Sequence, residues 1–394
     1  MKAVGIIFSN IHDNNVPELA RIRTLGSIPF GGRYRLIDFP LSNMVNSGIN
    51  TVGIITKSNY QSLMDHVGSG KDWDLARKDG GVIILPPYGD MESNSLYSSR
   101  LEALKGITSF LFRADEEYVV MTDCDSVSRV NYRDIIETHI RNHADITLVY
   151  KKLEKGTYPN KSATTFDMLG DRIVGVNYKE KLQEGFSNVF INAFVMKKSL
   201  LQNIVMDSIS HNKRYFMGDV IAANVESMKI MGYEHKGFYA GITSLQAYYD
   251  SNMKMLDENI RHEVFGDRSV FTKIRDSAPT KYGNSAIVKN SMIADGCVIE
   301  GEVENSIIFR NVKVARGTVV KNSIIMSDTT IGENTVIDYS IVDECVNIGK
   351  DVKIGEDKQS NKGIAVLGRN ITVSDGVIVE GGKIIDTDLN KEEN

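Results

Sequence analysis

Apolar residues recur at every sixth position in the C-terminal part of the sequence, from about residue 280 onward. Short polar or glycine-containing turns separate them, as in "IADGCV" and "IGENTV". A six-residue repeat is typical of a parallel β-helix, in which each repeat forms one face of a triangular coil and branched side chains stack inside. A sandwich of ordinary short strands is the alternative, but twelve apolar positions in phase favour the β-helix. We predict that these twelve positions point inward: Ile287, Ile293, Ile299, Ile308, Val314, Val320, Ile325, Ile331, Ile337, Val342, Ile348 and Ile354.

The sequence before this repeat alternates between strand-like and helix-like segments. The strand candidates are continuous apolar runs, as expected for parallel strands that are covered on both faces. They lie at 4–8, 51–56, 118–122, 146–151 and 189–196, and helical patterns lie at 132–142 and 200–209. We predict an α/β fold for residues 1–245, with a Rossmann-like, mixed and mostly parallel sheet that binds ligands at the carboxyl ends of its strands. Residues 246–280 are predicted to form a helical connector, and 281–394 the β-helix domain with a polar tail.

Charge and hydropathy exclude several classes of partner. The 394 residues carry a net charge of −5 and no dominant basic patch, so neither nucleic acid nor an anionic membrane is an expected partner. No apolar run approaches the length of a membrane span, and the start of the sequence does not resemble a signal peptide. We therefore expect a cytoplasmic protein. The open ends and flat sides of a β-helix make that domain a candidate surface for oligomerisation.

Cysteine and histidine usage narrows the chemistry further. Cys124, Cys297 and Cys345 form no CxxC motif, which indicates reduced thiols and excludes a four-cysteine zinc site. Some proteins that combine an α/β domain with a β-helix are acyltransferases that use a histidine of the β-helix as the base. The last histidine here is His262, so the β-helix offers no such base and an acyltransferase is disfavoured.

Several long segments resemble bacterial glucose-1-phosphate adenylyltransferase (ADP-glucose pyrophosphorylase), and the resemblance covers nearly the whole chain. It implies a nucleotidyltransferase domain followed by a left-handed β-helix, assembled as a tetramer. The implied reaction makes ADP-glucose and pyrophosphate from ATP and glucose 1-phosphate, with magnesium, for glycogen synthesis. The segments are "IPFGGRYRLIDFPLSNMVNSGI" (28–49), "DWDL" (72–75), "ILPP" (84–87), "SLQAYYDSNMKML" (244–256) and "VENSIIFRNVKVARGTVVKNSIIM" (303–326).

That reaction requires three devices, because a sugar-phosphate oxygen attacks the α-phosphorus of ATP and negative charge accumulates. A glycine-rich loop lets backbone N–H groups approach the triphosphate. Arginine and lysine side chains neutralise phosphate oxygens, and two aspartates hold magnesium.

The phosphate-binding loop departs from the family pattern. The family sequence Ala-Gly-Gly-x-Gly-Thr-Arg corresponds to residues 9–15, where Asn10 replaces a glycine and Asn15 replaces the arginine. In the following Arg-Ala-Lys-Pro-Ala motif, Arg23 is kept but the lysine is Leu25. The nucleotide-proximal motif Gly-Thr-Ala-Asp-Ala is "SRLEA" at 99–103. The resemblance therefore implies that no intact set of catalytic residues is present.

The metal site is half kept, and the sugar-phosphate side is better kept. Asp125 matches the first metal aspartate, whereas the second is Gly241, so magnesium binding is expected to be weak or absent and no cofactor is required. Glu180 and Lys181 match the family's Glu-Lys-Pro motif, and Asp219 matches the aspartate of its Lys-Asp motif, which makes them candidate substrate-binding residues.

Each candidate also has a structural interpretation. Asp125 and its neighbour Asp123 fit a solvated loop after a buried strand, and Glu180 with Lys181 fits an exposed turn equally well. Isolated histidines such as His12 and His66 are interpreted as hydrogen-bonded polar residues.

Three hypotheses about function follow. The first is a non-catalytic or weakly catalytic subunit, as in the GlgD-type branch of the family, that joins a catalytic adenylyltransferase subunit in a hetero-oligomer. The second is an active sugar-phosphate nucleotidyltransferase with altered phosphate contacts, in which Arg21, Arg23 and Arg33 supply positive charge. The third is a module that binds a sugar phosphate or nucleotide as an effector without turnover.

Overall fold

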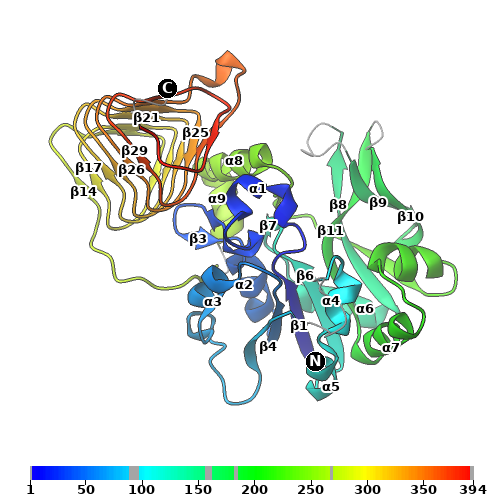
Figure 1. Cartoon of the computed structure of the whole chain (residues 1–394). Helices are drawn as coiled ribbons and strands as arrows, with labels where there is room; N and C mark the ends of the chain where they lie inside the picture. The colour runs from blue at the N-terminus through cyan, green and yellow to red at the C-terminus, as the bar shows by residue number, and fades with distance from the viewer. Residues whose placement is uncertain (1, 88–96, 156–161, 182–184, 267–268, 391–394) are drawn as a thin grey trace.

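The computed structural model describes residues 2–87, 97–155, 162–181, 185–266 and 269–390. The N-terminal part is an α/β domain, and the C-terminal part is a coiled stack of short strands that lies against one side of it (Figure 1). Helices α1 (Pro17–Ala20), α8 (Leu245–Met253) and α9 (Glu258–Phe265) lie between the two parts. The predicted α/β fold followed by a parallel β-helix is confirmed, although the sheet of the N-terminal domain is evenly mixed and not mostly parallel.

A nine-stranded mixed sheet forms the centre of the N-terminal domain, in the order β5-β4-β1-β6-β11-β8-β12-β10-β9. Strands β5, β4, β1 and β6 are mutually parallel, and β11 runs antiparallel to both β6 and β8. The strands are β1 (Ala3–Phe8), β4 (Thr51–Ile55), β5 (Gly81–Leu85), β6 (Tyr118–Asp123), β8 (Ile146–Glu154), β9 (Ser162–Leu169), β10 (Arg172–Lys181), β11 (Phe186–Lys197) and β12 (Ile230–Glu234). Two short ladders join β2 (Pro29–Phe30) to β3 (Tyr34–Arg35) and β7 (Ser126–Ser128) to β13 (Tyr239–Gly241).

Helices cover both faces of this sheet, which explains why its central strands are continuous apolar runs. In β1, Ile6 packs into a core with α4 (Arg100–Lys105), α5 (Thr108–Arg113) and α7 (Lys198–Ser210). The next residue, Ile7, packs into a second core with α2 (Asp38–Asn46), α3 (Gln61–Val67) and α6 (Tyr132–Arg141). Successive side chains of a strand point to opposite faces, so β1 contributes to both cores.

The C-terminal domain is built from three parallel six-stranded sheets, which form the faces of the β-helix. The first coil contains β14 (Lys281–Tyr282), β15 (Ile287–Lys289) and β16 (Met292–Ile293), and the last contains β29 (Thr372–Val373), β30 (Ile378–Val379) and β31 (Ile384–Ile385). The intervening strands are β17 (Val298–Ile299), β18 (Glu302–Glu304), β19 (Ile307–Ile308), β20 (Lys313–Val314), β21 (Val319–Lys321), β22 (Ile324–Ile325), β23 (Thr330–Ile331), β24 (Val336–Asp338), β25 (Ser340–Val342), β26 (Asn347–Ile348), β27 (Lys353–Ile354) and β28 (Ala365–Leu367).

One of the twelve predicted inward positions is wrong. Ile287 is 49% exposed, because the residue of β15 in register with the buried Val303 of the next coil is Val288, which is itself 37% exposed in this first coil. A shift of one residue moves a side chain to the other face of a strand, and the six-residue count does not detect it. Ile293 is partly buried against the core, and the other ten predicted positions are buried inside the coil.

The corners of the coil need left-handed backbone, which asparagine and glycine tolerate better than other residues. Asn305 and Asn322 occupy one column of such corners, and Tyr339 follows them with φ of 44°. The Tyr339 ring lies 5.0 Å from the Tyr249 ring of α8, and its hydroxyl donates a hydrogen bond to Gln246 Oε1 at 3.0 Å. The unusual corner residue is therefore one of the points at which the coil contacts α8, and the Tyr249 hydroxyl makes another by donating a hydrogen bond to the Asn322 carbonyl at 2.6 Å.

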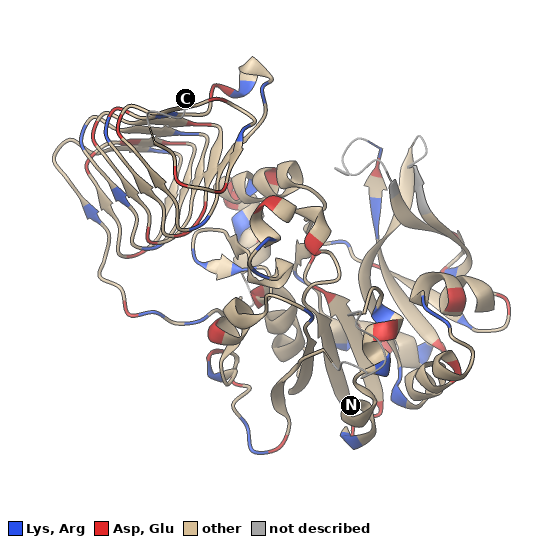
Figure 2. Cartoon of the chain, viewed as in Figure 1, with Lys and Arg blue, Asp and Glu red and all other residues tan. Residues whose placement is uncertain are grey.

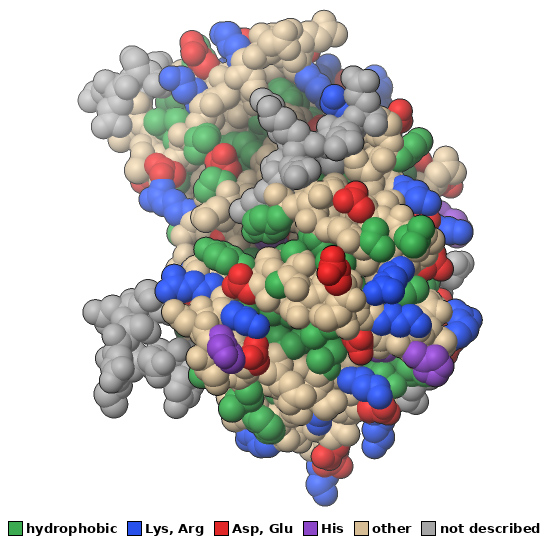
Figure 3. All heavy atoms as spheres, turned by 90° about the vertical axis from the view of Figure 1, so that its right-hand side faces the viewer, with side chains coloured by type: hydrophobic (Ala, Val, Ile, Leu, Met, Phe, Trp, Pro, Cys, Tyr) green, Lys and Arg blue, Asp and Glu red, His purple; other side chains and the backbone are tan. Residues whose placement is uncertain are grey.

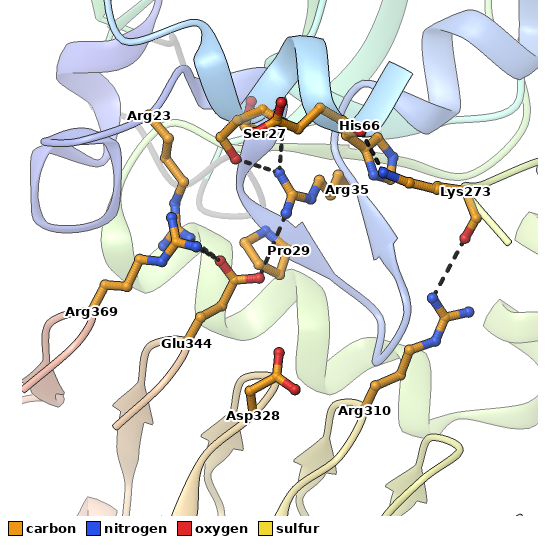
Figure 4. A network of polar contacts seen from close by, with 12 residues as sticks. Arg23, Ser27, Pro29, Arg35, His66, Lys273, Arg310, Asp328, Glu344 and Arg369 are labelled. Atoms are coloured by element: carbon orange, nitrogen blue, oxygen red, sulfur yellow. Dashed lines mark hydrogen bonds and ion pairs between the residues drawn. The ribbon is translucent and has the colours of Figure 1, made fainter. Parts of the chain in front are cut away.

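The two domains share one hydrophobic core and a buried polar network (Figure 4). In the core, Leu25 and Tyr248 of the N-terminal part join Phe309 of the β-helix. In the network, the fully buried Arg23 contacts two carboxylates of the β-helix: its Nη2 lies 2.5 Å from Asp343 Oδ2, and its Nη1 lies 3.1 Å from Glu344 Oε2. These contacts fix the orientation of the domains.

Charges of both signs are interspersed over the two domains (Figure 2). On the face shown in Figure 3, hydrophobic side chains lie in small groups among Lys, Arg, Asp and Glu. Within the described part of the chain, none of the helices has the length and apolar content needed to cross a membrane.

Candidate functional site

The candidate site lies where the parallel strands β1 and β6 end. The two strands pair in register with Phe8 opposite Asp123, the last residue of β6, and Asp125 follows just before β7. Both aspartates are buried. Sheets of this type bind ligands beyond the carboxyl ends of their strands, so this is the position expected for phosphates and metal.

Two basic side chains reach into this position. His12, in the loop after β1, places Nε2 2.6 Å from Asp123 Oδ2 and 3.6 Å from Asp125 Oδ2. Arg100, the first residue of α4, donates from Nε to Asp123 Oδ1 at 3.1 Å and from Nη2 to Asp123 Oδ2. Asp123 is therefore held by both basic residues.

Asn192 completes the arrangement, which we call the strand-end cluster: His12, Arg100, Asp123, Asp125 and Asn192. Its Oδ1 accepts a hydrogen bond from Arg100 Nη2 at 2.7 Å, and its Nδ2 donates to Asp125 Oδ2 at 2.6 Å. The β11–β8 register shifts between Phe190 and Ala193, and Asn192 has φ of 56° in this bulge. Bulges re-aim side chains, and this one directs Asn192 between Arg100 and Asp125.

The electrostatics of the strand-end cluster favour internal ion pairs. Burial opposes ionisation of Asp123, but Arg100 and His12 outweigh it, so the pKa of Asp123 is lowered. Burial also opposes protonation of His12, yet the carboxylates of Asp125 and Asp123 raise its pKa above the ordinary value. The pKa of Asp125 is raised, because burial and the Asp123 charge together outweigh the attraction of His12. Asp123 is thus the firmly ionised carboxylate of the cluster.

The loop residues that replace the family's phosphate-binding motif are engaged within the protein. Asn10 accepts a hydrogen bond from the Tyr97 hydroxyl at 3.1 Å, and Asn15 Nδ2 donates to the Ile242 carbonyl at 2.9 Å. Leu25, at the family's lysine position, is buried in the core shared by the two domains. These side chains hold the loop in place and supply no cation for a triphosphate.

The three arginines considered as replacement cations lie toward the β-helix. Arg21 pairs with Asp386, and Arg23 is buried against Asp343 and Glu344. Arg33 lies over the Tyr34 ring, with 5.7 Å from its guanidinium carbon to the ring centroid, and lines a hollow with Glu344. The three arginines interact at the interface between the domains and do not reach the strand ends. This arrangement disfavours the hypothesis that they supply new phosphate contacts.

The family uses a magnesium ion, and the candidate ligands for it in this chain are Asp125, Asp123 and His12. His12, Asp123 and Asp125 bring potential ligand atoms within 4.8 Å of one another. However, Gly241 lies beside Asp125, opposite Ser126 in the β7–β13 ladder, and provides no carboxylate. Mg²⁺ prefers oxygen ligands and several bound waters, whereas imidazole and guanidinium groups occupy this position. The residues present do not fit a magnesium site.

The predicted sugar-phosphate residues are only partly described. The backbones of Glu180 and Lys181 end strand β10, but their side chains lie outside the described residues. Asp219 accepts hydrogen bonds from the backbone N–H groups of Arg214 and Tyr215, at 2.8 and 2.9 Å, and these bonds lower its pKa. Asp219 therefore shapes the turn before the π-helix Phe216–Ile221, and substrate binding by the three residues stays a prediction.

Sequence reasoning missed Arg100 and Asn192. The motif that contains Arg100 is altered in the sequence, but nothing in it links the arginine to Asp123. The sequence does hold one signal: Arg100 lies at the position of an uncharged threonine in the nucleotide-proximal motif, whereas His12 lies at the variable position of the loop motif. Asn192 carried no such signal, since the bulge that aims it is a feature of the folded sheet.

Asp13 in the same loop should make stability depend on pH. Burial raises its pKa from 3.8 to about 7, although its carboxylate accepts a hydrogen bond from the Leu25 N–H at 2.7 Å. A carboxyl group with a raised folded-state pKa binds protons more tightly in the native state, so stability falls as pH rises from about 4 to 7. Asp13→Asn keeps an acceptor for Leu25 and removes the titration. We expect urea unfolding at pH 5 and pH 8 to show a smaller difference for this variant than for the natural chain, and equal differences would contradict the expectation.

Comparisons with known proteins agree with the fold. The nucleotidyl transferase family profile matches residues 19–258, and the GlmU-like C-terminal hexapeptide profile matches residues 277–373. The chain is therefore a nucleotidyl transferase-type protein with a hexapeptide β-helix.

Individual relatives narrow the family. The chain is 33% identical to the glycogen biosynthesis protein GlgD of Bacillus subtilis, over 81% of this chain and 82% of that protein. It is 34% identical to GlgD of Geobacillus stearothermophilus, over 81% and 83%, and 31% identical to a glucose-1-phosphate adenylyltransferase of Clostridium botulinum, over 81% and 83%. The chain belongs to the family of glucose-1-phosphate adenylyltransferases and their GlgD relatives.

Proposed function

We propose that this chain is a non-catalytic or weakly catalytic subunit that associates with a catalytic glucose-1-phosphate adenylyltransferase chain. In that assembly it supports ADP-glucose synthesis from ATP and glucose 1-phosphate for glycogen. The observation that carries the proposal is the strand-end cluster, in which His12 and Arg100 contact the buried carboxylate of Asp123 at the strand ends, where the family resemblance implies metal and phosphates.

The altered positions act on different parts of the reaction. Leu25 removes a cation that would face the phosphates, Gly241 removes a metal ligand, and Asn10 replaces a loop glycine. A phosphoryl-transfer site works mainly by positioning and by neutralising charge, so each change weakens the same step. The α/β domain and the β-helix, in contrast, are both formed and share a core. A preserved scaffold with an altered reaction site supports a role in assembly or regulation.

Reconstitution tests this proposal. The chain is mixed in equal amounts with the catalytic adenylyltransferase of the same organism, and the molecular mass is measured by size exclusion with light scattering. We expect a hetero-oligomer, on the scale of a tetramer, whose ADP-glucose synthesis per catalytic chain differs from that of the catalytic chain alone.

The control replaces this chain by an equal amount of an unrelated protein of similar size. Mixtures in which the two chains elute separately, and in which the rate and its response to sugar-phosphate effectors are unchanged, would remove the support for a partner role.

A further inference from the structure

The strand-end cluster contains two buried carboxylates whose charge needs compensation. We propose that Arg100, assisted by His12, is a built-in counter-ion that takes the place of a divalent cation at Asp123 and Asp125. This inference deepens the proposed function and rests on it in one respect, namely that this cluster is the former reaction site. It assigns to Arg100 a positioning and charge-neutralising role that the sequence comparison alone does not give.

Arg100 binds Asp123 in a bidentate ion pair. Its Nε and Nη2 groups bind the two oxygens of Asp123 separately, and Nη2 also donates to Asn192 Oδ1 at 2.7 Å. Two parallel N–H···O bonds between guanidinium and carboxylate form the strong bidentate arrangement. The Arg100 side chain is 13% exposed and that of Asp123 is 0% exposed, so water screens the pair little.

Charge balance in the cluster supports the same conclusion. Arg100 carries a full positive charge in proteins at any ordinary pH, and His12 lies within 2.6 Å of Asp123. Opposite them are the carboxyl groups of Asp123 and Asp125, which lie close enough to repel each other when both are ionised. A divalent ion would neutralise two carboxylates with one centre. The guanidinium and imidazole groups achieve this neutralisation with covalently attached groups.

One carboxylate oxygen of the strand-end cluster has no hydrogen-bond partner among the described residues. Asp125 is buried, and within the described residues its Oδ1 has no hydrogen-bond partner, while Oδ2 accepts from Asn192. Removal of the Arg100 side chain would leave a space beside Asp123. Asp125 Oδ1, the Asp123 carboxylate and the His12 imidazole would then be available to bind an ion in that space. Mixed imidazole and carboxylate ligands suit Mn²⁺ or Zn²⁺ better than Mg²⁺. The proposal therefore predicts that loss of Arg100 converts the cluster into a site for such an ion.

The test uses the full chain and Arg100→Ser. Without metal, we expect this variant to lose several degrees in Tm relative to the natural chain, because two buried carboxylates lose their arginine. MnCl₂ at a hundredfold excess over Kd should raise its Tm by on the order of 4 °C. The natural chain and Arg100→Lys, which keeps the charge, should show no comparable shift. Mn²⁺ affinity, measured by electron paramagnetic resonance, should be at least about tenfold tighter for Arg100→Ser than for the natural chain.

Two controls separate a metal site from general destabilisation. Arg310→Ser removes another buried arginine, whose Nε lies 3.2 Å from the single carboxylate of Asp295, and it should lower Tm without Mn²⁺ rescue. Adding Asp125→Asn to Arg100→Ser should abolish the rescue. Equal Mn²⁺ shifts for Arg100→Ser and Arg310→Ser, or no Mn²⁺ binding by Arg100→Ser, would overturn the proposal.

The natural chain provides a test that does not depend on the folding of any variant. Mn²⁺ titrated into it should give no saturable binding below millimolar concentration at the strand-end cluster. Tight binding that disappears in Asp125→Asn would refute the counter-ion role. These results are separable from the partner assay, because a chain that fails to associate with a catalytic subunit can still show Mn²⁺ rescue of Arg100→Ser, and the reverse outcome is equally distinguishable.

Discussion

Supplied alone with ATP, glucose 1-phosphate and magnesium, this chain should form ADP-glucose roughly 10²–10⁵-fold more slowly than a catalytic glucose-1-phosphate adenylyltransferase. Removing one preorganised group that stabilises developing charge costs about 2.7–4 kcal/mol, and every 1.36 kcal/mol is a factor of ten in rate. Here the lysine position is Leu25 and the second metal aspartate is Gly241. These losses do not add fully, since the groups act as a unit, so one or two such terms set the expected range.

The measurement follows ADP-glucose directly by chromatography, with a catalytic relative assayed in parallel at the same substrate concentrations. Traces of a co-purifying catalytic chain are the main source of a false signal. An Asp125→Asn variant controls for them, because activity from this chain should change with that substitution and activity from a contaminant should not. Turnover within tenfold of the catalytic relative would contradict the prediction and would favour an active transferase.

Arg23→Met should destabilise the chain by about 3–5 kcal/mol, the cost of breaking a buried ion pair from one side. Arg23 is 0% exposed, and its guanidinium is shared between Asp343 and Glu344 of the β-helix. After the substitution Glu344 still has Arg35 and Arg369 at 3.7 and 3.6 Å, whereas Asp343 loses its close cationic partner. The uncompensated carboxylate of Asp343 should dominate the loss, measured as the free energy of unfolding in urea.

Arg21→Met is the matched control for this prediction. Arg21 lies two residues away and also pairs with a β-helix carboxylate, Asp386, but its side chain is 61% exposed. An exposed pair is worth about 0–1 kcal/mol, so the control should be nearly neutral. Replacing Asp343 by leucine together with Arg23→Met should recover much of the lost stability. If the two arginine variants unfold at the same urea concentration, the buried pair does not hold the domains together.

The repeat in the sequence was sufficient to predict the β-helix, because stacking coils demand one inward apolar residue at regular intervals. It failed at Ile287, where only the pairing of Val288 with Val303 reveals the correct face of the strand. The corners were also beyond prediction. Left-handed backbone is expected at asparagine and glycine, and the tyrosine at position 339 makes sense only once its contact with α8 is known.

In the candidate site, too, features within one motif could be predicted from the sequence, whereas contacts between residues far apart in the chain could not. The altered loop and the glycine at position 241 could be recognised from the sequence, because each lies within a motif of the family. The contacts that replace the lost groups could not be recognised from the sequence, because Arg100, Asp123 and Asn192 meet only in the folded sheet. Arg23 lies in a family motif of the phosphate site, whereas its ion-pair partner Asp343 lies in the β-helix domain.

The segment between His12 and Arg23 is fastened at both of its ends. His12 is hydrogen-bonded to Asp123 at the end of β6, and Arg23 is ion-paired to Asp343 in the β-helix. A displacement of the β-helix coil that contains Asp343 would therefore also move the loop at the strand ends. The movement would pass through a short stretch of backbone and the core residue Leu19. In an assembly whose subunits touch through their β-helices, the segment would connect that contact mechanically to the strand-end cluster.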